Sequence, residues 1–460
     1  MTYEKAVAYL DSLTNFERTP RPDEMRAVPL SRMERICRRL GDPQRRFRSI
    51  LIAGTNGKGS VAAMLYSMLR ESELRAGLYT SPHIEHLRER IRTWTGGPTP
   101  GERVHGDDWI TPEAFAEGVA EVRQAIEAVR RETPSLPPTY FEAMTALAFL
   151  QFQRQGVEVA VLEVGLGGRL DATNVAAPAV SVITPVDIDH TEVLGNSPGA
   201  IAKEKAGIIK PGQCVISAPQ HDEVASVIAA ACEAQGAFLC AGGRDVTARI
   251  ARHDADGLQV SLTGQRGIYE SLEIPLLGRH QAMNAALAVA AMEALSDAGA
   301  PHLVVERGLS RVAWPGRIEI VNDAPLVIMD GAHNAHAAAA LAETVLELSA
   351  GRRIHLLIGM SSDKSVEEVG RALGPLAISA TCTRSRHPRA LDPMVLAKRL
   401  GPFCQDVHVM SDAPDAYTYL LNAVPPGDVI VVTGSLFLVG QLRALLRQPN
   451  VGVRRAGAGA

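Results

Sequence analysis

The stretch Ile50-Leu51-Ile52-Ala53-Gly54-Thr55-Asn56-Gly57-Lys58-Gly59-Ser60 decides the fold. Its four apolar residues predict a buried strand, its glycines predict a tight turn, and the apolar positions after Ser60 predict a helix. In such a strand–turn–helix unit, backbone N–H groups and the positive end of the helix form a cradle for phosphate groups. Lys58 can reach the β- and γ-phosphates, and Ser60 can cap the helix or assist a metal ion.

The spacing within this loop departs from the common phosphate-loop pattern. Gly59 stands where that pattern has serine or threonine directly after the lysine, and the loop is shorter. A plain glycine-rich turn is the alternative interpretation. The preceding strand, the following helix and the lysine together favour phosphate binding.

The bulk properties of the chain restrict the class of protein. The 460 residues exceed the usual size of one hydrophobic core, so we expect two domains. A formal net charge of −4 gives no indication of a nucleic acid or an anionic membrane as partner. No apolar run reaches the ~18 residues of a membrane-spanning helix. Six scattered cysteines without a CxxC pair predict reduced thiols in a cytoplasmic protein, which we expect to be a monomer.

Short apolar strands alternate with longer amphipathic helices, which predicts an α/β fold with a mostly parallel sheet covered on both faces. The main predicted strands are residues 49–53, 157–163, 180–184, 214–217, 326–330, 354–359 and 429–433. The main predicted helices are residues 60–71, 112–131, 141–155 and 281–298.

Turn-rich and polar segments indicate how these elements are organised. Residues 258–277 alternate in polarity and predict antiparallel strands at a sheet edge, and residues 96–108 predict a surface loop. A fresh strand–helix alternation begins after Ala313-Trp314-Pro315-Gly316. We therefore expect a phosphate-loop domain over residues 1–313 and a smaller Rossmann-like α/β domain over residues 314–460.

Polar residues follow further predicted strands, at the edge where ligand sites of α/β proteins gather. Thr80-Ser81-Pro82-His83 follows one strand, and Glu163 ends another before a glycine-rich run. Glu163 resembles the strand-end carboxylate that holds magnesium in phosphate-loop enzymes; a solvated strand-end charge is the alternative. His190 alone would more often be a structural residue, since magnesium prefers oxygen ligands. Lys205, in Lys203-Glu204-Lys205-Ala206-Gly207, would alone be part of a solvated charge run.

The ordered series of these segments resembles the folylpolyglutamate synthase and dihydrofolate synthase family, within the wider group of Mur ligases. The resemblance extends from the phosphate loop to Thr433-Gly434-Ser435-Leu436. The segments that match the family's signatures are residues 54–60, 79–83, 163–174, 189–190 and 204–208.

The resemblance implies roles for residues of the first domain. The loop from Gly54 to Ser60 would hold the phosphates of ATP, with Lys58 acting directly on them. Ser81, Glu163 and His190 would bind Mg²⁺. Lys205 would be carbamylated by carbon dioxide and, as a carboxylate-like group, would hold a second Mg²⁺ or its waters. Because this modification needs a neutral amine, we expect Lys205 to be partly buried or to have its pKa lowered by the metal.

The resemblance also implies roles for residues further along the chain. Asn284 would contact the nucleotide, and Arg317 would reach its phosphates. Asp330 and His333 would be the second-domain pair that closes over ATP, with His333 acting in catalysis. The region of Thr139 to Glu142, together with Asp171, would take part in gripping the pterin.

The implied activity is an ATP-dependent ligation. The γ-carboxylate of a folate would attack the γ-phosphate of ATP to give an acyl phosphate, and L-glutamate would displace phosphate to leave folylpolyglutamate and ADP. Dihydropteroate is open as a second acceptor, since both reactions use the same ATP machinery. The alternatives are a dihydrofolate synthase only, another Mur-like amino-acid ligase, and a non-catalytic nucleotide-binding protein.

Overall fold

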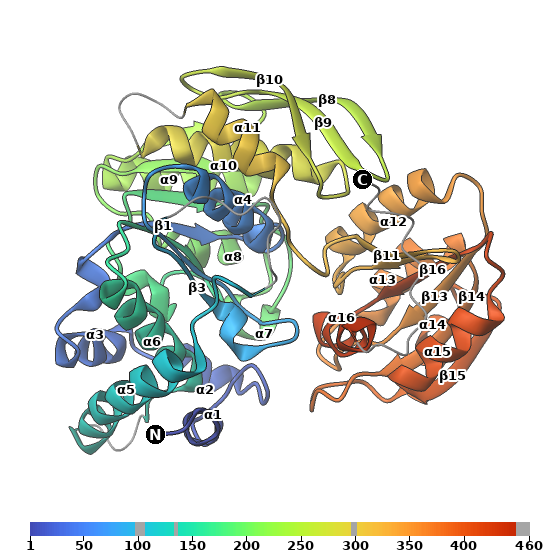
Figure 1. The fold of residues 1–460 in the computed structure, drawn as a ribbon, viewed down its shortest axis with the longest axis horizontal. Helices are drawn as coiled ribbons and strands as arrows, with labels where there is room; N and C mark the ends of the chain where they lie inside the picture. The colour runs from blue at the N-terminus through green and yellow to red at the C-terminus, as the bar shows by residue number, and fades with distance from the viewer. Residues whose placement is uncertain (97–105, 133–136, 296–300, 448–460) are drawn as a thin grey trace. The chain divides into compact units, whose positions relative to one another are not determined.

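A computed structural model of the chain describes residues 1–96, 106–132, 137–295 and 301–447. Most of the loop predicted over residues 96–108, and the end of the helix predicted over residues 281–298, lie outside these described residues. The contacts between residues divide the chain into two compact units (Figure 1). Unit 1 comprises Met1–Arg249, Val260–Glu273 and Ala282–Val312, and unit 2 comprises Ile250–Gln259, Ile274–Gln281 and Ala313–Ala460. Within the described ranges, no helix combines the length and the apolar character needed to cross a membrane.

Unit 1 is built on a seven-stranded sheet of order β3-β2-β4-β1-β5-β6-β7. Its strands are β1 (Arg48–Ala53), β2 (Ala76–Tyr79), β3 (Ile91–Trp94), β4 (Val159–Glu163), β5 (Val180–Ile183), β6 (Cys214–Ser217) and β7 (Phe238–Ala241). Neighbouring strands are parallel except for β2 and β3, which are antiparallel. Every residue of β2, β4 and β5 is buried, as in a parallel sheet covered on both faces. The predicted mostly parallel sheet is confirmed.

Helices cover this sheet and supply its core. They are α1 (Tyr3–Asp11), α2 (Pro22–Ala27), α3 (Leu30–Arg39), α4 (Lys58–Glu71), α5 (Pro112–Glu132), α6 (Tyr140–Arg154), α7 (Thr191–Leu194), α8 (Pro198–Ala206), α9 (Asp222–Gln235), α10 (His280–Ala294) and α11 (His302–Ser310). Residues of α3, α5 and α6 share one apolar core with Leu51 of β1 and Leu162 of β4. Helix α4 begins at Lys58, earlier than predicted, because Gly57 takes a left-handed φ of 86° and forms its N-cap.

A separate three-stranded sheet of order β10-β9-β8 contains β8 (Thr247–Asp254), β9 (Gly257–Thr263) and β10 (Ile268–Ile274). Strands were predicted here, but their placement at the edge of a larger sheet is wrong, since they pair with one another. The buried carboxylate of Glu293 on α10 holds the turn between β9 and β10. It accepts hydrogen bonds from the backbone N–H groups of Gln265 and Arg266 and from the hydroxyl of Tyr269, at 2.8, 3.3 and 3.0 Å.

Unit 2 contains a six-stranded sheet of order β11-β12-β16-β13-β14-β15, in which only β11 and β12 are antiparallel. Its strands are β11 (Glu319–Asp323), β12 (Leu326–Met329), β13 (Ile354–Ile358), β14 (Ala377–Arg384), β15 (Val407–Asp412) and β16 (Val429–Thr433). Its helices are α12 (Ala335–Ser349), α13 (Val366–Leu373), α14 (Pro393–Leu400), α15 (Ala413–Ala423) and α16 (Leu436–Arg443).

The strands of unit 2 bury both of their faces. Leu326 and Ile328 of β12 share a core with α12, α13 and α14. Val327 and Met329 of the same strand share another core with α15 and α16. This period of two places helices on both sides of the sheet, and it confirms a second α/β sheet domain after the phosphate-loop sheet.

Candidate functional site

The register of the central strands of unit 1 brings the predicted functional segments to one edge of the sheet. Ile52 of β1 lies beside Glu163 of β4, and Ala53 lies beside Ile183 of β5. Tyr79 of β2 lies beside Leu162. Since these strands are parallel, the residues that follow them emerge at the same edge. The phosphate loop, Ser81, Glu163 and the segment after β5 therefore lie next to one another along this edge.

The phosphate loop is fastened to the segment that follows β5. The backbone N–H groups of Thr55 and Asn56 donate to the carbonyl oxygen of Pro185, at 2.9 and 3.3 Å. The Thr55 hydroxyl oxygen lies 3.0 Å from both the backbone oxygen and the backbone nitrogen of Asp187. Pairing on both sides of Thr55 fixes the loop to the segment that follows β5. That support from residues 185–187 was not predicted from the sequence.

Two glycines of the loop lie so close to other side chains that a Cβ atom would force a shift. A Cβ atom on Gly54 would lie 1.8 Å from the hydroxyl oxygen of Thr184, and Gly54 has a φ of +150°. A Cβ atom on Gly57 would lie 2.8 Å from the side-chain oxygen of Asn284. The structure thus brings Asn284, which was predicted to contact the nucleotide, against the phosphate loop.

Two lysines meet at one carbonyl oxygen of the loop. The Nζ of Lys58 donates to the carbonyl oxygens of Gly54 and Thr55, at 3.1 and 3.2 Å. The Nζ of Lys205, from α8, donates to the same oxygen of Gly54 at 2.7 Å. Lys205 is only 4% exposed. Burial, assisted by the nearby charge of Lys58, lowers the pKa of Lys205 to about 7. The expectation that Lys205 is buried is confirmed.

Glu163 and Ser81 lie within one hydrogen bond of each other. The backbone N–H of Ser81 donates to a carboxylate oxygen of Glu163 at 3.1 Å, and Glu163 is 5% exposed. A strand-end carboxylate beside a serine provides the oxygen ligands that magnesium prefers. Their role as Mg²⁺ ligands stays a prediction.

His190 occupies a different environment. It is exposed, has a left-handed φ of 52° and precedes α7, and its Nε2 lies 3.9 Å from a carboxylate oxygen of Asp189. Its role as a third ligand stays a prediction. Over the part of the chain that the structure describes, no three His, Cys, Asp or Glu side chains cluster as a metal site.

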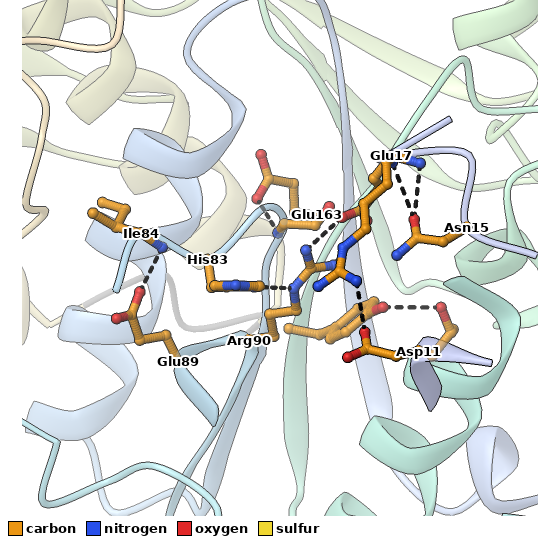
Figure 2. Close-up of polar contacts among 12 residues, drawn as sticks. Asp11, Asn15, Glu17, His83, Ile84, Glu89, Arg90 and Glu163 are labelled. Carbon is orange, nitrogen blue, oxygen red and sulfur yellow. Dashed lines mark hydrogen bonds and ion pairs between the residues drawn. The ribbon is translucent and has the colours of Figure 1, made fainter. Parts of the chain in front are cut away.

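A charged network beside Ser81 was missed at the sequence level. Arg90 lies between Glu17 and His83 (Figure 2). Its guanidinium donates to both carboxylate oxygens of Glu17, at 2.8 and 2.5 Å, and to Nδ1 of His83, at 3.0 Å. It also lies over the ring of Tyr140, 5.5 Å from the ring centroid. Burial and the charge of Arg90 lower the pKa of His83 to about 3, so His83 is neutral and accepts this hydrogen bond.

The two carboxylates that the resemblance associated with the pterin are engaged in holding the backbone. Asp171 accepts hydrogen bonds from the backbone N–H groups of Gly165 and Leu166, both at 3.0 Å, and from Thr173. Burial raises the pKa of Asp171. Glu142 forms a buried pair with Arg32, at 2.8 and 2.5 Å. Both carboxylates therefore shape the loops around them, and a direct contact with a substrate stays a prediction.

The remaining predicted residues lie in unit 2. The carboxylate of Asp330, at the end of β12, accepts hydrogen bonds from the backbone N–H groups of Ile318 and Ala332, at 2.9 and 2.7 Å. Burial raises the pKa of Asp330, and the nearby charge of Arg317 opposes that change. Nδ1 of His333 lies 2.7 Å from the carbonyl oxygen of Gly331. Arg317, Asp330 and His333 thus gather around the end of β12, and their contacts with a nucleotide stay predictions.

Comparison with known families matches two consecutive parts of the chain. Residues 117–292 match the Mur ligase middle domain. Residues 316–436 match the Mur ligase glutamate ligase domain.

Individual relatives cover nearly the whole chain. The dihydrofolate synthase/folylpolyglutamate synthase of Bacillus subtilis is 34% identical over 91% of this chain and 95% of its own length. A probable bifunctional folylpolyglutamate synthase/dihydropteroate synthase of Haloferax volcanii is 37% identical over 96% of this chain, which spans 50% of that relative's length. The structure of Mycobacterium tuberculosis folylpolyglutamate synthase with ADP and AMPPCP has a TM-score of 0.86 at 32% identity, over 97% of this chain and 99% of that one.

Proposed function

Because this chain belongs to the folylpolyglutamate synthase and dihydrofolate synthase family of Mur ligases, we propose that it activates a folate γ-carboxylate with ATP and joins it to L-glutamate. The chain is an ATP-dependent ligase of that family. The second activity named for the Haloferax volcanii relative is not part of the proposal, since this chain spans only 50% of that protein.

The observation that carries the proposal is the meeting of Lys58 and Lys205 at the carbonyl oxygen of Gly54, at 3.1 and 2.7 Å. An amine with a pKa of about 7 is largely neutral at physiological pH, and a neutral amine adds carbon dioxide. In our proposal, carbamylation turns Lys205 into an anion beside the phosphate loop. A largely neutral amine is thereby replaced by a negative charge that attracts a metal cation.

Different residues of the chain have different roles in the proposed reaction. The N–H groups at the start of α4 and Lys58 hold the phosphates of ATP. Glu163, Ser81, His190 and the modified Lys205 hold two Mg²⁺ ions. Bound magnesium would neutralise charge where a carboxylate approaches a phosphate. The chain contributes orientation, a water-poor site and fixed dipoles for the acyl phosphate. We assign the ATP site to a domain of residues 1–313. We propose that a second domain of residues 314–460 contributes Arg317, Asp330 and His333 as further contacts of the nucleotide.

The acceptor decides which of the family's two reactions takes place. We propose the γ-carboxylate of tetrahydrofolate as the primary acceptor and dihydropteroate as a second one. The test is to give the purified protein ATP, magnesium and L-glutamate with each acceptor separately, and to identify the products by mass. We expect a tetrahydrofolate product longer by one or more glutamates, with one ADP released per bond. A product from dihydropteroate alone would replace the proposal with a dihydrofolate synthase, and glutamate-independent ADP release would overturn ligation.

We further propose that the enzyme acts as a cytoplasmic monomer on small molecules, without a nucleic-acid or membrane partner. The net charge of −4 and six free cysteines support this assignment. Light scattering after gel filtration tests the oligomeric state, and a mass near 49.1 kDa is the expected result.

A further inference from the structure

The loop between β2 and β3 carries Ser81 at its start and Arg90 at its end. The backbone N–H of Thr80 donates to the carbonyl oxygen of Arg90 at 3.1 Å, which closes the loop. Within the loop, the side chain of Arg90 reaches back and donates from Nε to Nδ1 of His83, at 3.0 Å. Only Pro82 separates His83 from Ser81. One hydrogen bond and two peptide units therefore connect the side chain of Arg90 to Ser81.

The middle of this loop is held independently of Arg90. The carboxylate of Glu89 accepts hydrogen bonds from the backbone N–H groups of Ile84, Glu85 and His86, at 2.8, 3.0 and 2.7 Å. Charge-assisted bonds of this kind are roughly twice as strong as neutral ones. The turn at residues 84–89 can persist when the contacts of Arg90 change. A perturbation of Arg90 then acts on the start of the loop, where Ser81 lies.

Arg90 is held in turn by an acidic residue of the N-terminal segment. Arg90 is 1% exposed, and the Glu17 side chain that pairs with it is 27% exposed. Burial opposes the charge of Arg90, and the carboxylate of Glu17 outweighs that effect, so the pKa of Arg90 is raised. Glu17 is itself placed by a turn in which its backbone N–H donates to the side-chain oxygen of Asn15 at 3.0 Å. A buried guanidinium without its counter-ion is costly, so Arg90 cannot keep this position unaided.

We propose that Glu17 is a positioning residue for magnesium binding, and that it acts through Arg90 and His83 on the orientation of Ser81. The inference rests on the proposed function, because it takes Ser81 and Glu163 as the magnesium site. The N–H of Ser81 is hydrogen-bonded to Glu163 at 3.1 Å, so a small rotation of the loop start changes the distance between the two oxygen ligands. Residues that orient metal ligands commonly affect affinity although they never touch the ion.

The test measures the binding of Mn²⁺, as a paramagnetic substitute for Mg²⁺, to the full-length protein with ADP present. Glu17→Gln removes the charge and keeps the shape, and we expect the dissociation constant of Mn²⁺ to rise about tenfold. Glu17→Asp restores the carboxylate, and most of the affinity should return. The matched control is Asp11→Asn, which breaks an exposed ion pair with Arg18 in the same segment, at 3.1 Å. Its Mn²⁺ affinity should equal that of the wild type.

The outcomes separate this inference from the proposed function. If Glu163→Gln weakens Mn²⁺ binding and folded Glu17→Gln does not, the role of Glu17 is refuted and the metal site stands. If Glu163→Gln leaves Mn²⁺ binding unchanged, the metal site fails and the role of Glu17 fails with it. An equal loss in Asp11→Asn would also refute the inference. If Glu17→Gln does not fold, His83→Leu cuts the same connection, and unchanged Mn²⁺ affinity in that variant would overturn it.

Discussion

The modification of Lys205 gives the most informative prediction, because the same burial controls both reactivity and stability. The pKa of Lys205 falls from 10.5 to about 7, chiefly through burial and then through the charge of Lys58. At pH 7.5 roughly three quarters of such an amine is neutral, against roughly 0.1% of an ordinary lysine. The neutral fraction of Lys205, which can react with carbon dioxide, is therefore several hundred times larger than that of a surface lysine.

In the unmodified protein, the burial of Lys205 should lower the free energy of unfolding. The shift from 10.5 to about 7 corresponds to at most roughly 5 kcal/mol of unfavourable free energy for burying the charged amine. The folded pKa lies below the unfolded one, so the folded chain binds fewer protons between pH 7 and 10.5, and stability rises with pH across that window. Below pH 7 the amine is charged in both states, and the penalty is fully present.

Lys205→Met should therefore stabilise the chain and inactivate it. At pH 6, in buffer without carbon dioxide, the variant should gain up to about 4 kcal/mol of unfolding free energy, because the lost hydrogen bond to Gly54 offsets about 1 kcal/mol. Chemical denaturation measures the gain, and ADP release measures the activity. With ¹³C-labelled bicarbonate, wild-type protein should show a carbamate signal by NMR that Lys205→Met lacks.

Lys203→Met is the matched control, because Lys203 lies on the same helix, α8, and is exposed. It should keep the carbamate signal, the activity and the wild-type stability. Two results would refute the reasoning: full activity of wild-type protein whose Lys205 stays unmodified at saturating bicarbonate, or a Lys205→Met variant that is less stable than wild type at pH 6.

Three further substitutions test separate parts of the structure. Glu163→Gln should fold normally and lower kcat/KM by at least about 100-fold, because it removes a charged magnesium ligand. Gly54→Ala should abolish ADP binding measured by calorimetry, because its Cβ would lie 1.8 Å from the hydroxyl oxygen of Thr184. Glu142→Gln should lower the unfolding free energy by about 3–5 kcal/mol in urea, because it leaves the buried Arg32 without its counter-ion.

Each of these substitutions has a control or a contrary result. Gly212 has a positive φ of 68° with nothing near its Cβ position, so Gly212→Ala should keep ADP affinity. The exposed pair of Arg21 and Glu24 should contribute under about 1 kcal/mol when Glu24→Gln breaks it. Near-wild-type turnover in Glu163→Gln would remove Glu163 from the metal site.

Features with a local signal were predictable. The phosphate loop, the strand before it and the helix after it are consecutive in the sequence. The glycines and the lysine identify the loop directly. The end of β4 at Glu163 was found because its apolar run stops there, and β5 ends at Ile183, one residue before the predicted end at Thr184. The start of α4 was predicted too late. Gly57 is the N-cap because of its φ of 86°, and the sequence does not give backbone angles. The strands at residues 258–277 were found, but not which strands they pair with.

The sequence by itself determined the main strands and helices, the position of the phosphate loop and the family that the chain resembles, because periodicity, turn residues and ordered motifs are local or consecutive. Only the tertiary structure decided what the charged residues do. The bond from Lys205 to Gly54 joins residues 151 positions apart, and the pair of Arg90 and Glu17 joins residues 73 positions apart. The pKa of Lys205 and the position of the Arg90 side chain depend on desolvation and on neighbours that folding brings together. No spacing in the chain encodes them.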